Sequence, residues 1–267
     1  MTQEAPKQKR LPIPPAVQER MKIIKNTIVI MSGKGGVGKS TVAANLALAL
    51  AKLNPGKVGI IDVDIHGPDI PKILGLEGKL PTSSPSGTIP VIGPNGLKVV
   101  SMAFFLEIDT PVIWRGPMKM KVIEQFLSDF AWGELDTLVF DLPPGTGDEP
   151  LSLMQLIPKL TGVIIVTTPQ AVSLLDTGKA LAMANQLGIP VLGVIENMSS
   201  FICPNCKTIH KLFGEGGGKE LASKFDVPLL GQIPLDPQIR EQEDKGISEA
   251  FDYFESIVEK LKESLQS

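Results

Sequence analysis

A run of residues beginning at Gly33 combines glycines, a lysine and a hydroxyl group in the spacing G-x-x-x-x-G-K-S. Successive glycines let backbone N–H groups point inward at a chain of phosphates. Lys39 is placed to reach the β- and γ-phosphates of a nucleotide, and the Ser40 hydroxyl to hold Mg²⁺. The spacing predicts an ATP-binding phosphate loop made of Gly33, Lys34, Gly35, Gly36, Val37, Gly38, Lys39, Ser40 and Thr41.

The segments on either side of this loop supply the scaffold that a phosphate site needs. The apolar residues 27–31 predict a buried strand, and residues 42–50 predict a helix that starts directly after the loop. The first N–H groups of such a helix have no partner within it, and its dipole is positive at that end, so it favours an anion. An ordinary glycine-rich turn would need neither the lysine nor the serine.

Lys34 is a second lysine in the loop, directly after its first glycine. An extended side chain at this position can cross to the phosphates of a neighbouring subunit. A positive charge supplied from a second subunit stabilises the charge that develops during phosphoryl transfer. The alternative for Lys34 is an ordinary solvated surface charge.

Three aspartates follow apolar strands and are candidates for the chemistry around the phosphates. Asp62 and Asp64 end the strand predicted at 57–61, and Asp141 ends the strand predicted at 137–140. Carboxylates at the C-terminal ends of parallel strands face the ligand crevice of an open α/β sheet. We expect Asp141 and Asp62 to serve Mg²⁺ and Asp64 to orient the attacking water. Loop-start or helix-capping aspartates are the alternative.

Strands and helices alternate along the whole chain of 267 residues, 43% of which are hydrophobic. Alternation of this kind predicts the α/β class, with a doubly wound, mostly parallel sheet. We expect a single domain over residues 23–267, with the cysteine pair in an insertion near 203–206. Residues 1–22 are polar and contain prolines, which predicts a mobile or loosely docked arm.

Composition also argues against several classes of partner. A net charge of −3 gives no bulk attraction to nucleic acid. No apolar run reaches the ~18–20 residues that cross a bilayer. The amphipathic stretch 250–265 has a net acidic polar face, so we expect a helix packed on the sheet and no membrane contact. The first residues lack the apolar core of a secretion signal, and we expect a cytoplasmic protein.

The chain contains only two cysteines, Cys203 and Cys206, in the pattern C-P-N-C. Such a knuckle suits metal binding because backbone N–H groups can point at the thiolates. A zinc site or a cubane cluster takes four ligands, so two chains related by a two-fold axis would complete it. His210 is a candidate third ligand within one chain. The spacing is also compatible with a redox pair or with chance.

The phosphate loop resembles the deviant Walker A motif of the MinD/ParA/nitrogenase-iron-protein class of dimerising ATPases. The resemblance rests on K-G-G-V-G-K-S at 34–40 and on D-V-D-I-H-G-P at 62–68. It implies that Lys34 acts across a dimer and that Asp64 positions water. It also implies that Asn197, at the end of a later strand, pairs with the adenine edge, and we expect Asp236 to border the base or ribose.

With the cysteines included, the chain resembles the Mrp/ApbC family of ATP-binding iron–sulfur cluster carriers. The resemblance implies a [4Fe–4S] cluster bridging the cysteine pairs of a homodimer, ATP hydrolysis that supports cluster carriage, and transfer to apo iron–sulfur proteins. The matching segments are residues 33–41, 62–69, 141–148, 196–198 and 203–206, followed by His210 and the pair 213–214.

Three other functions are compatible with parts of the sequence. A positioning ATPase of the MinD/ParA kind would need a basic membrane helix or DNA-binding patch. An electron-transfer ATPase like the nitrogenase iron protein has its ligand cysteines far apart in sequence. A dimeric ATPase bridged by zinc, without cluster transfer, would use the same two thiolates.

Overall fold

The structure, a computed structural model, describes residues 12–64, 67–105, 116–247 and 252–266. Within these residues the centre of the fold is an eight-stranded sheet in the order β12-β9-β8-β1-β7-β2-β6-β5. All neighbouring strands are parallel except the edge strand β5, which runs antiparallel to β6. The strands are β1 (Ile24–Ser32), β2 (Val58–Asp62), β5 (Val91–Ile92), β6 (Lys98–Ser101), β7 (Leu135–Asp141), β8 (Gly162–Thr167), β9 (Val191–Asn197) and β12 (Leu229–Ile233).

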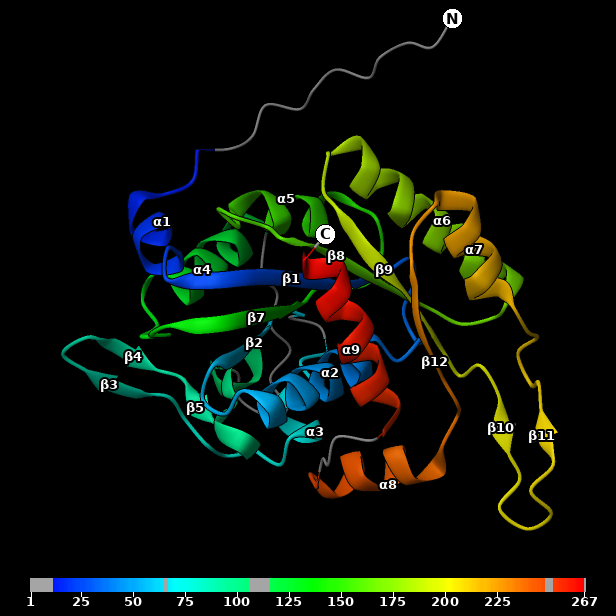
Figure 1. Cartoon of the computed structure of the whole chain (residues 1–267). Coiled ribbons are helices and arrows are strands. Elements are labelled where there is room, and N and C mark those ends of the chain that lie inside the picture. The colour runs from blue at the N-terminus through cyan, green and yellow to red at the C-terminus, as the bar shows by residue number, and fades with distance from the viewer. Residues whose placement is uncertain (1–11, 65–66, 106–115, 248–251, 267) are drawn as a thin grey trace, which may run out of the picture.

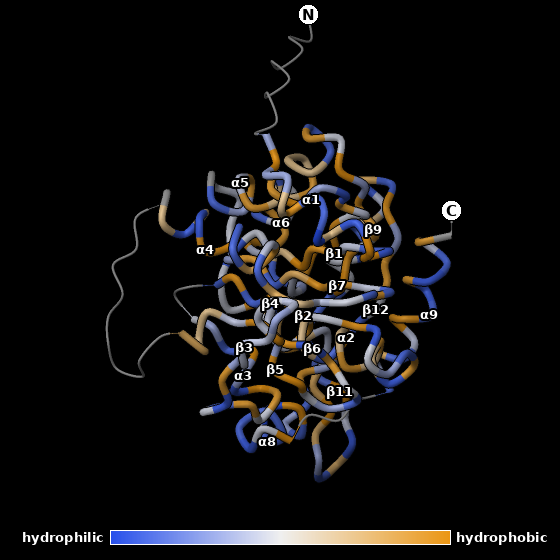
Figure 2. Tube along the Cα trace, turned by 90° about the vertical axis from the view of Figure 1, so that its left-hand side faces the viewer, coloured by the Kyte–Doolittle hydropathy of each residue, from blue (hydrophilic) through white to orange (hydrophobic). Residues whose placement is uncertain are grey.

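Each face of this sheet carries its own hydrophobic core, because successive side chains of a strand point to opposite faces. On β1, Ile28 and Ile30 belong to one core, whereas Val29 and Met31 belong to the other. All four side chains are fully buried. Apolar residues run through the strands at the middle of the molecule in Figure 2. A sheet covered on both sides explains why its strands read as continuous apolar runs in the sequence.

Helices cover both faces, as Figure 1 shows. One core is closed by α2 (Lys39–Leu53), α3 (Ile70–Ile73), α8 (Pro237–Lys245) and α9 (Asp252–Gln266). The other is closed by α1 (Pro15–Met21), α4 (Gly116–Ser128), α5 (Asp148–Leu156), α6 (Ala171–Gln186) and α7 (Gly217–Phe225). The predicted fold class is confirmed: a doubly wound, mostly parallel sheet with helices on both faces.

Two short hairpins lie outside the main sheet. One is formed by β3 (Thr82–Ser84) and β4 (Gly87–Ile89), and the other by β10 (Phe201–Ile202) and β11 (Ile209–His210). Two 3₁₀ turns, η1 (Pro94–Gly96) and η2 (Met102–Phe105), flank β6. In Figure 1 the β10–β11 hairpin extends away from the body of the molecule.

The N-terminal region differs from the prediction of a loose arm over residues 1–22. Residues 15–21 form α1, whose Val17 and Met21 are buried against the α4 side of the core. Only two of the seven residues of this helix are buried, too few to form an apolar stripe that the sequence alone would reveal. The first 11 residues lie outside the described part of the chain.

The C-terminal stretch predicted at 250–265 contains α9, which is described from Asp252 onward, and the apolar stripe of this helix packs on the sheet. Positions 250 and 251 lie outside the described residues. Phe254, Ile257, Val258 and Leu261 are buried in the same core as α2. No helix in the described part of the chain is long and apolar enough to span a bilayer.

Candidate functional site

The phosphate loop joins β1 to α2, and its backbone takes the shape that its glycines permit. Gly36 and Gly38 have φ angles of 77° and 76°, in the left-handed region that side chains with a Cβ disfavour. Gly38 is also the residue that precedes the first turn of α2. Gly33 lies so close to α6 that a Cβ there would collide with the backbone carbonyl group of Asp176. The loop therefore has the predicted shape, with the start of α2 at its centre.

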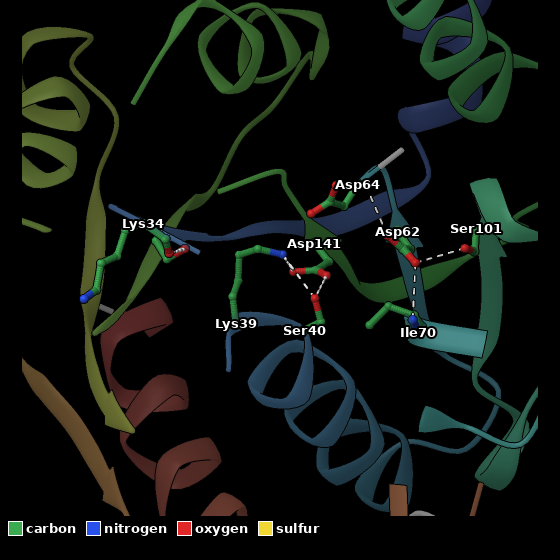
Figure 3. Close-up of polar contacts among 9 residues, drawn as sticks. Lys34, Lys39, Ser40, Asp62, Asp64, Ile70, Ser101 and Asp141 are labelled. Atoms are coloured by element: carbon green, nitrogen blue, oxygen red, sulfur yellow. Dashed lines mark hydrogen bonds and ion pairs between the residues drawn. The ribbon is translucent and has the colours of Figure 1, made fainter. Parts of the chain in front are cut away.

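Lys39, Ser40 and Asp141 form a connected cluster at the carboxyl end of the sheet (Figure 3). Lys39 Nζ lies 2.5 Å from Asp141 Oδ1, and the Ser40 hydroxyl donates to Asp141 Oδ2 at 2.6 Å. Lys39 is 6% exposed and Asp141 is 0% exposed, so this ion pair is removed from water. The three residues predicted to serve phosphate and Mg²⁺ are brought together.

Asp62 lies beside Asp141 in the sheet, where the two residues are register partners of β2 and β7. Asp62 Oδ2 accepts hydrogen bonds from Ser101 Oγ at 2.9 Å and from the Ile70 backbone N–H at 3.3 Å. Burial, followed by the neighbouring Asp141 charge, raises the pKa of Asp62 well above its usual range. Lys39 balances the charge of one of these two buried carboxyls, so a further cation is needed to ionise both, which fits a divalent metal with hard oxygen ligands.

A cleft of about 410 Å³ opens above the loop. Asp64, which is 9% exposed, lies on its wall. Burial, and then the charge of Asp64, raises the pKa of Asp69, another residue of this wall. The remaining walls come from the loop itself, from helices α3 and α8, from Ser32 at the end of β1 and from Pro144 after β7.

Glu243 of α8 also lines the cleft, although no pattern in the sequence predicts it. Its carboxylate accepts from Thr41 Oγ1 at 3.1 Å and from Asn45 Nδ2 at 3.2 Å. Burial raises the pKa of Glu243. Glu243 is about 200 residues from Thr41 in the chain, and no local pattern marks such a contact. An acid within an otherwise polar helix looks like any solvated side chain.

Lys34 extends away from the Lys39–Asp141 pair in Figure 3. Its Nζ lies 3.4 Å from Gln170 Oε1, at the start of α6, and the side chain is half-buried on the rim of the cleft. The Lys34 charge therefore lies at the rim of the cleft, whereas the Lys39 charge is buried beside Asp141.

Asn197 and Asp236 lie outside the residues that line this cleft. Asn197 Nδ2 donates to the Val37 carbonyl at 2.9 Å, and its Oδ1 accepts from the Met198 backbone N–H at 2.9 Å. Asp236 caps α8, accepting from the Gln238 backbone N–H at 2.9 Å. The structure thus shows structural contacts for both residues, and their contact with the base or ribose stays a prediction.

Cys203 and Cys206 occupy the turn between β10 and β11. Two backbone hydrogen bonds close this turn. The Cys203 N–H donates to the Thr208 carbonyl at 3.0 Å, and the Lys207 N–H donates to the Cys203 carbonyl at 2.9 Å. Both cysteines are free thiols; Cys203 is half-buried and Cys206 is exposed. Cys206 Sγ lies 3.2 Å from Thr208 Oγ1, and hydrogen bonds with Thr208, then with Cys203, lower the pKa of Cys206 to about 7.

Among the residues that the structure describes, none joins these thiols as a third metal ligand. In the described ranges, no group of three or more His, Cys, Asp or Glu side chains is placed to hold a metal ion. His210 pairs with Phe201 across the hairpin, and its ring lies 6.3 Å from the Phe201 ring. The structure therefore gives no support to His210 as a ligand within one chain.

Comparison with known proteins decides the family. A family model described as "NUBPL iron-transfer P-loop NTPase" in the ParA group matches residues 23–266. The chain belongs to this family. Two relatives named "Iron-sulfur cluster carrier protein" are also similar. The protein from Methanocaldococcus jannaschii is 51% identical over 94% of this chain and 88% of its own length. That from Saccharolobus solfataricus is 54% identical over 86% and 78%.

Solved structures agree with this assignment. A nucleotide-binding protein from Archaeoglobus fulgidus, in complex with ADP, has a TM-score of 0.80 and 43% identity over 90% of this chain and 94% of its own. The cell division ATPase MinD from Pyrococcus furiosus has a TM-score of 0.65 and 24% identity over 89% and 98%, and shows the shared fold alone. The predicted resemblance to an iron–sulfur carrier family built on the MinD/ParA fold is confirmed.

Proposed function

We propose that this chain binds iron–sulfur clusters through Cys203 and Cys206 and transfers them to apo iron–sulfur proteins. ATP binding and hydrolysis at the phosphate loop would control the carriage. The observation that carries this proposal is the presence, on one chain, of a cleft lined by the phosphate loop and of two free thiols on a projecting hairpin. The names of the relatives support it.

The proposed carrier is a homodimer, because one chain offers two thiolates and a [4Fe–4S] cluster takes four. Large apolar side chains around the hairpin and the start of α6 are exposed, which favours a protein contact there. They are Val172 (63%), Leu175 (71%), Ile202 (45%), Ile209 (60%) and Leu212 (58%). Lys34 bonds to Gln170, the residue before α6, so this apolar surface adjoins the lysine proposed to act across the dimer.

The proposed reaction at the cleft is hydrolysis of ATP with Mg²⁺. The donor set fits that ion, since Ser40 Oγ and the carboxylates of Asp62 and Asp141 are hard oxygen ligands. When bound, Mg²⁺ supplies positive charge beside the phosphates. Lys39 binds the terminal phosphates, and Asp64 on the cleft wall orients the water.

Two further roles complete the proposed reaction. Lys34 stabilises the transferred phosphoryl group of the partner's nucleotide. Asn197 and Asp236 contact the adenine and the ribose. Free thiols suit a reducing compartment, so we place this activity in the cytoplasm. A net charge of −3 gives no bulk attraction to nucleic acid or to an anionic membrane, and we propose neither as a partner.

Anaerobic reconstitution with iron and sulfide tests the proposal. The wild type should take up about four iron and four sulfide per dimer, and lose both on transfer to an apo acceptor. The Cys203→Ser, Cys206→Ser double variant should take up none while keeping its affinity for MgADP. Equal cluster content in that variant would refute the proposal.

Zinc bridging is the second candidate, because two thiolates from each of two chains also make a tetrahedral zinc site. Metal and sulfide analysis of anaerobically purified protein separates the two candidates. Iron with equimolar sulfide supports the carrier, and zinc without sulfide supports a zinc-bridged ATPase. A MinD/ParA-like positioning role would instead be supported by ATP-dependent pelleting with liposomes or DNA.

A further inference from the structure

The phosphate loop and the cysteine hairpin are attached to the same end of one strand, β9. Asn197, the last residue of β9, donates its Nδ2 hydrogen bond to the Val37 carbonyl at 2.9 Å. The fit is close, since a Cβ on Gly38 would collide with Asn197 Nδ2. A movement of the loop at Gly38 must therefore move Asn197 or break this contact.

Glu196, the neighbour of Asn197, points to the opposite face, as the alternation of a strand requires. Its Oε2 accepts from the Gly218 backbone N–H at 2.5 Å, in the first turn of α7. Its Oε1 accepts from Gln232 Nε2 at 2.6 Å, on the neighbouring strand β12. Glu196 is fully buried, so these two hydrogen bonds take the place of the water that would solvate an exposed carboxyl group.

The cysteine hairpin lies between these two attachment points in the chain. Its first leg leaves β9 after Asn197, and its second leg enters α7. The first leg is held to the end of β12 by the Ser199 N–H, which donates to the Ile233 carbonyl at 2.9 Å. The start of α7 packs directly on Glu196, since a Cβ on Gly218 would lie 2.8 Å from Glu196 Cβ.

We propose that Glu196 is a positioning residue that couples the phosphate loop to the cysteine hairpin. On one face of β9, Asn197 is hydrogen-bonded to the phosphate loop and moves with it. On the other face, Glu196 holds the α7 end of the hairpin. A carboxylate suits this role because charge-assisted bonds to backbone N–H groups are strong and directional. A change at the loop reaches both ends of the hairpin through two adjacent residues of one strand.

This inference rests on the proposed function for its biological use, but its test needs no cluster. Deuterium exchange of residues 201–216 is measured in reduced, metal-free, full-length protein with and without saturating MgADP. In the wild type we expect MgADP to change this exchange by about fivefold or more, the scale of ordinary coupling between sites. The dissociation constant for MgADP is measured on every variant.

Glu196→Ala should abolish the nucleotide effect on the hairpin while MgADP still binds with nearly unchanged affinity. Glu196→Gln retains an acceptor for the Gly218 N–H and should keep most of the effect. Thr27→Val is the matched control, because Thr27 is also buried and bonds to the Lys159 carbonyl, far from both sites. It should keep the full effect.

Persistence of the full nucleotide effect in Glu196→Ala would overturn the proposal, as would a wild type whose hairpin ignores bound MgADP. If Glu196→Ala does not fold, Gly218→Ala perturbs the same contact from the α7 side and decides the question in the same way. Failure of cluster reconstitution with an intact nucleotide effect would refute the proposed function alone.

Discussion

Lys39 Nζ and Asp141 Oδ1 form an ion pair 2.5 Å apart that is almost completely buried. The lysine proposed to bind phosphate and the carboxylate proposed to serve Mg²⁺ thus neutralise each other within the protein. Removing one member of a buried pair leaves the other charge without a partner, which costs far more than the loss of a surface pair. The two loop lysines should therefore differ sharply in their effect on stability.

Lys39→Ala should lower the free energy of unfolding, measured by urea denaturation without nucleotide at neutral pH, by about 3–5 kcal/mol. The loss should shrink on acidification, because protonation of Asp141 removes the unpaired charge. Lys34→Ala is the control: its 3.4 Å contact with Gln170 should contribute less than about 1 kcal/mol. Equal losses in the two variants would contradict the buried pair.

Asp62 should make the stability of the protein depend on pH. Burial raises its pKa in the folded state, so the folded protein holds this proton more tightly than the unfolded chain does. The contribution of Asp62 to stability must then fall as pH rises from about 4 through its folded-state pKa, by about 1.4 kcal/mol for each unit of pKa difference. Asp62→Asn should flatten this slope between pH 4.5 and 8 in urea denaturation without nucleotide and Mg²⁺.

Asp136→Asn is the matched control for the slope, because Asp136 forms an exposed ion pair with Lys25. It should leave the pH dependence as in the wild type. The Asp62 variant should also bind MgADP more weakly, since it removes a proposed metal ligand. A wild-type slope retained in Asp62→Asn would show that another group titrates.

Glu243 places a carboxylate on the wall of the cleft that receives phosphates. Glu243→Gln removes its charge, and the rotatable Thr41 hydroxyl can still bond to the amide. We expect the dissociation constant for MgADP, measured by calorimetry, to fall by about threefold or more at pH 8. Because burial raises the pKa of Glu243, the gain should shrink as pH falls and the wild-type carboxyl is protonated.

Glu241→Gln serves as the control on the same helix, since Glu241 is exposed and lies outside the cleft lining. It should change the affinity for MgADP little. Indistinguishable effects of the two substitutions would mean that Glu243 acts only through the net charge of the protein.

The contrast between Lys39 and Glu243 shows which residues of the site can be predicted from the sequence and which cannot. Local patterns predict the positions of Lys39, Ser40 and Asp141. Lys39 and Ser40 are consecutive residues of the phosphate-loop motif, and Asp141 ends an apolar strand. The contacts of Glu243 and Glu196 join elements distant in the chain, and only tertiary packing brings them together. For the same reason the sequence does not predict α1, since its burial depends on α4 and only two of its seven residues are buried.

The turn between β10 and β11 is predicted to stabilise the Cys206 thiolate, and the reactivity of Cys206 in reduced, metal-free protein tests this. Hydrogen bonds with Thr208 lower the pKa of this thiol to about 7. Since the thiolate is the nucleophile, the rate of alkylation by iodoacetamide should rise with pH and reach half its maximum near pH 7. Peptide mass spectrometry resolves Cys206 from Cys203 in the same experiment.

Thr208→Val removes the hydroxyl 3.2 Å from Cys206 Sγ and keeps a similar shape. The midpoint of the alkylation profile should move up toward the usual range of a free thiol, about 8.5. Thr161→Val, a change far from the hairpin, should leave the midpoint near 7, because Thr161 bonds to Thr27. A midpoint near 8.5 in the wild type would show that the turn does not stabilise the thiolate, and the Cys206 thiol would then be an ordinary exposed cysteine.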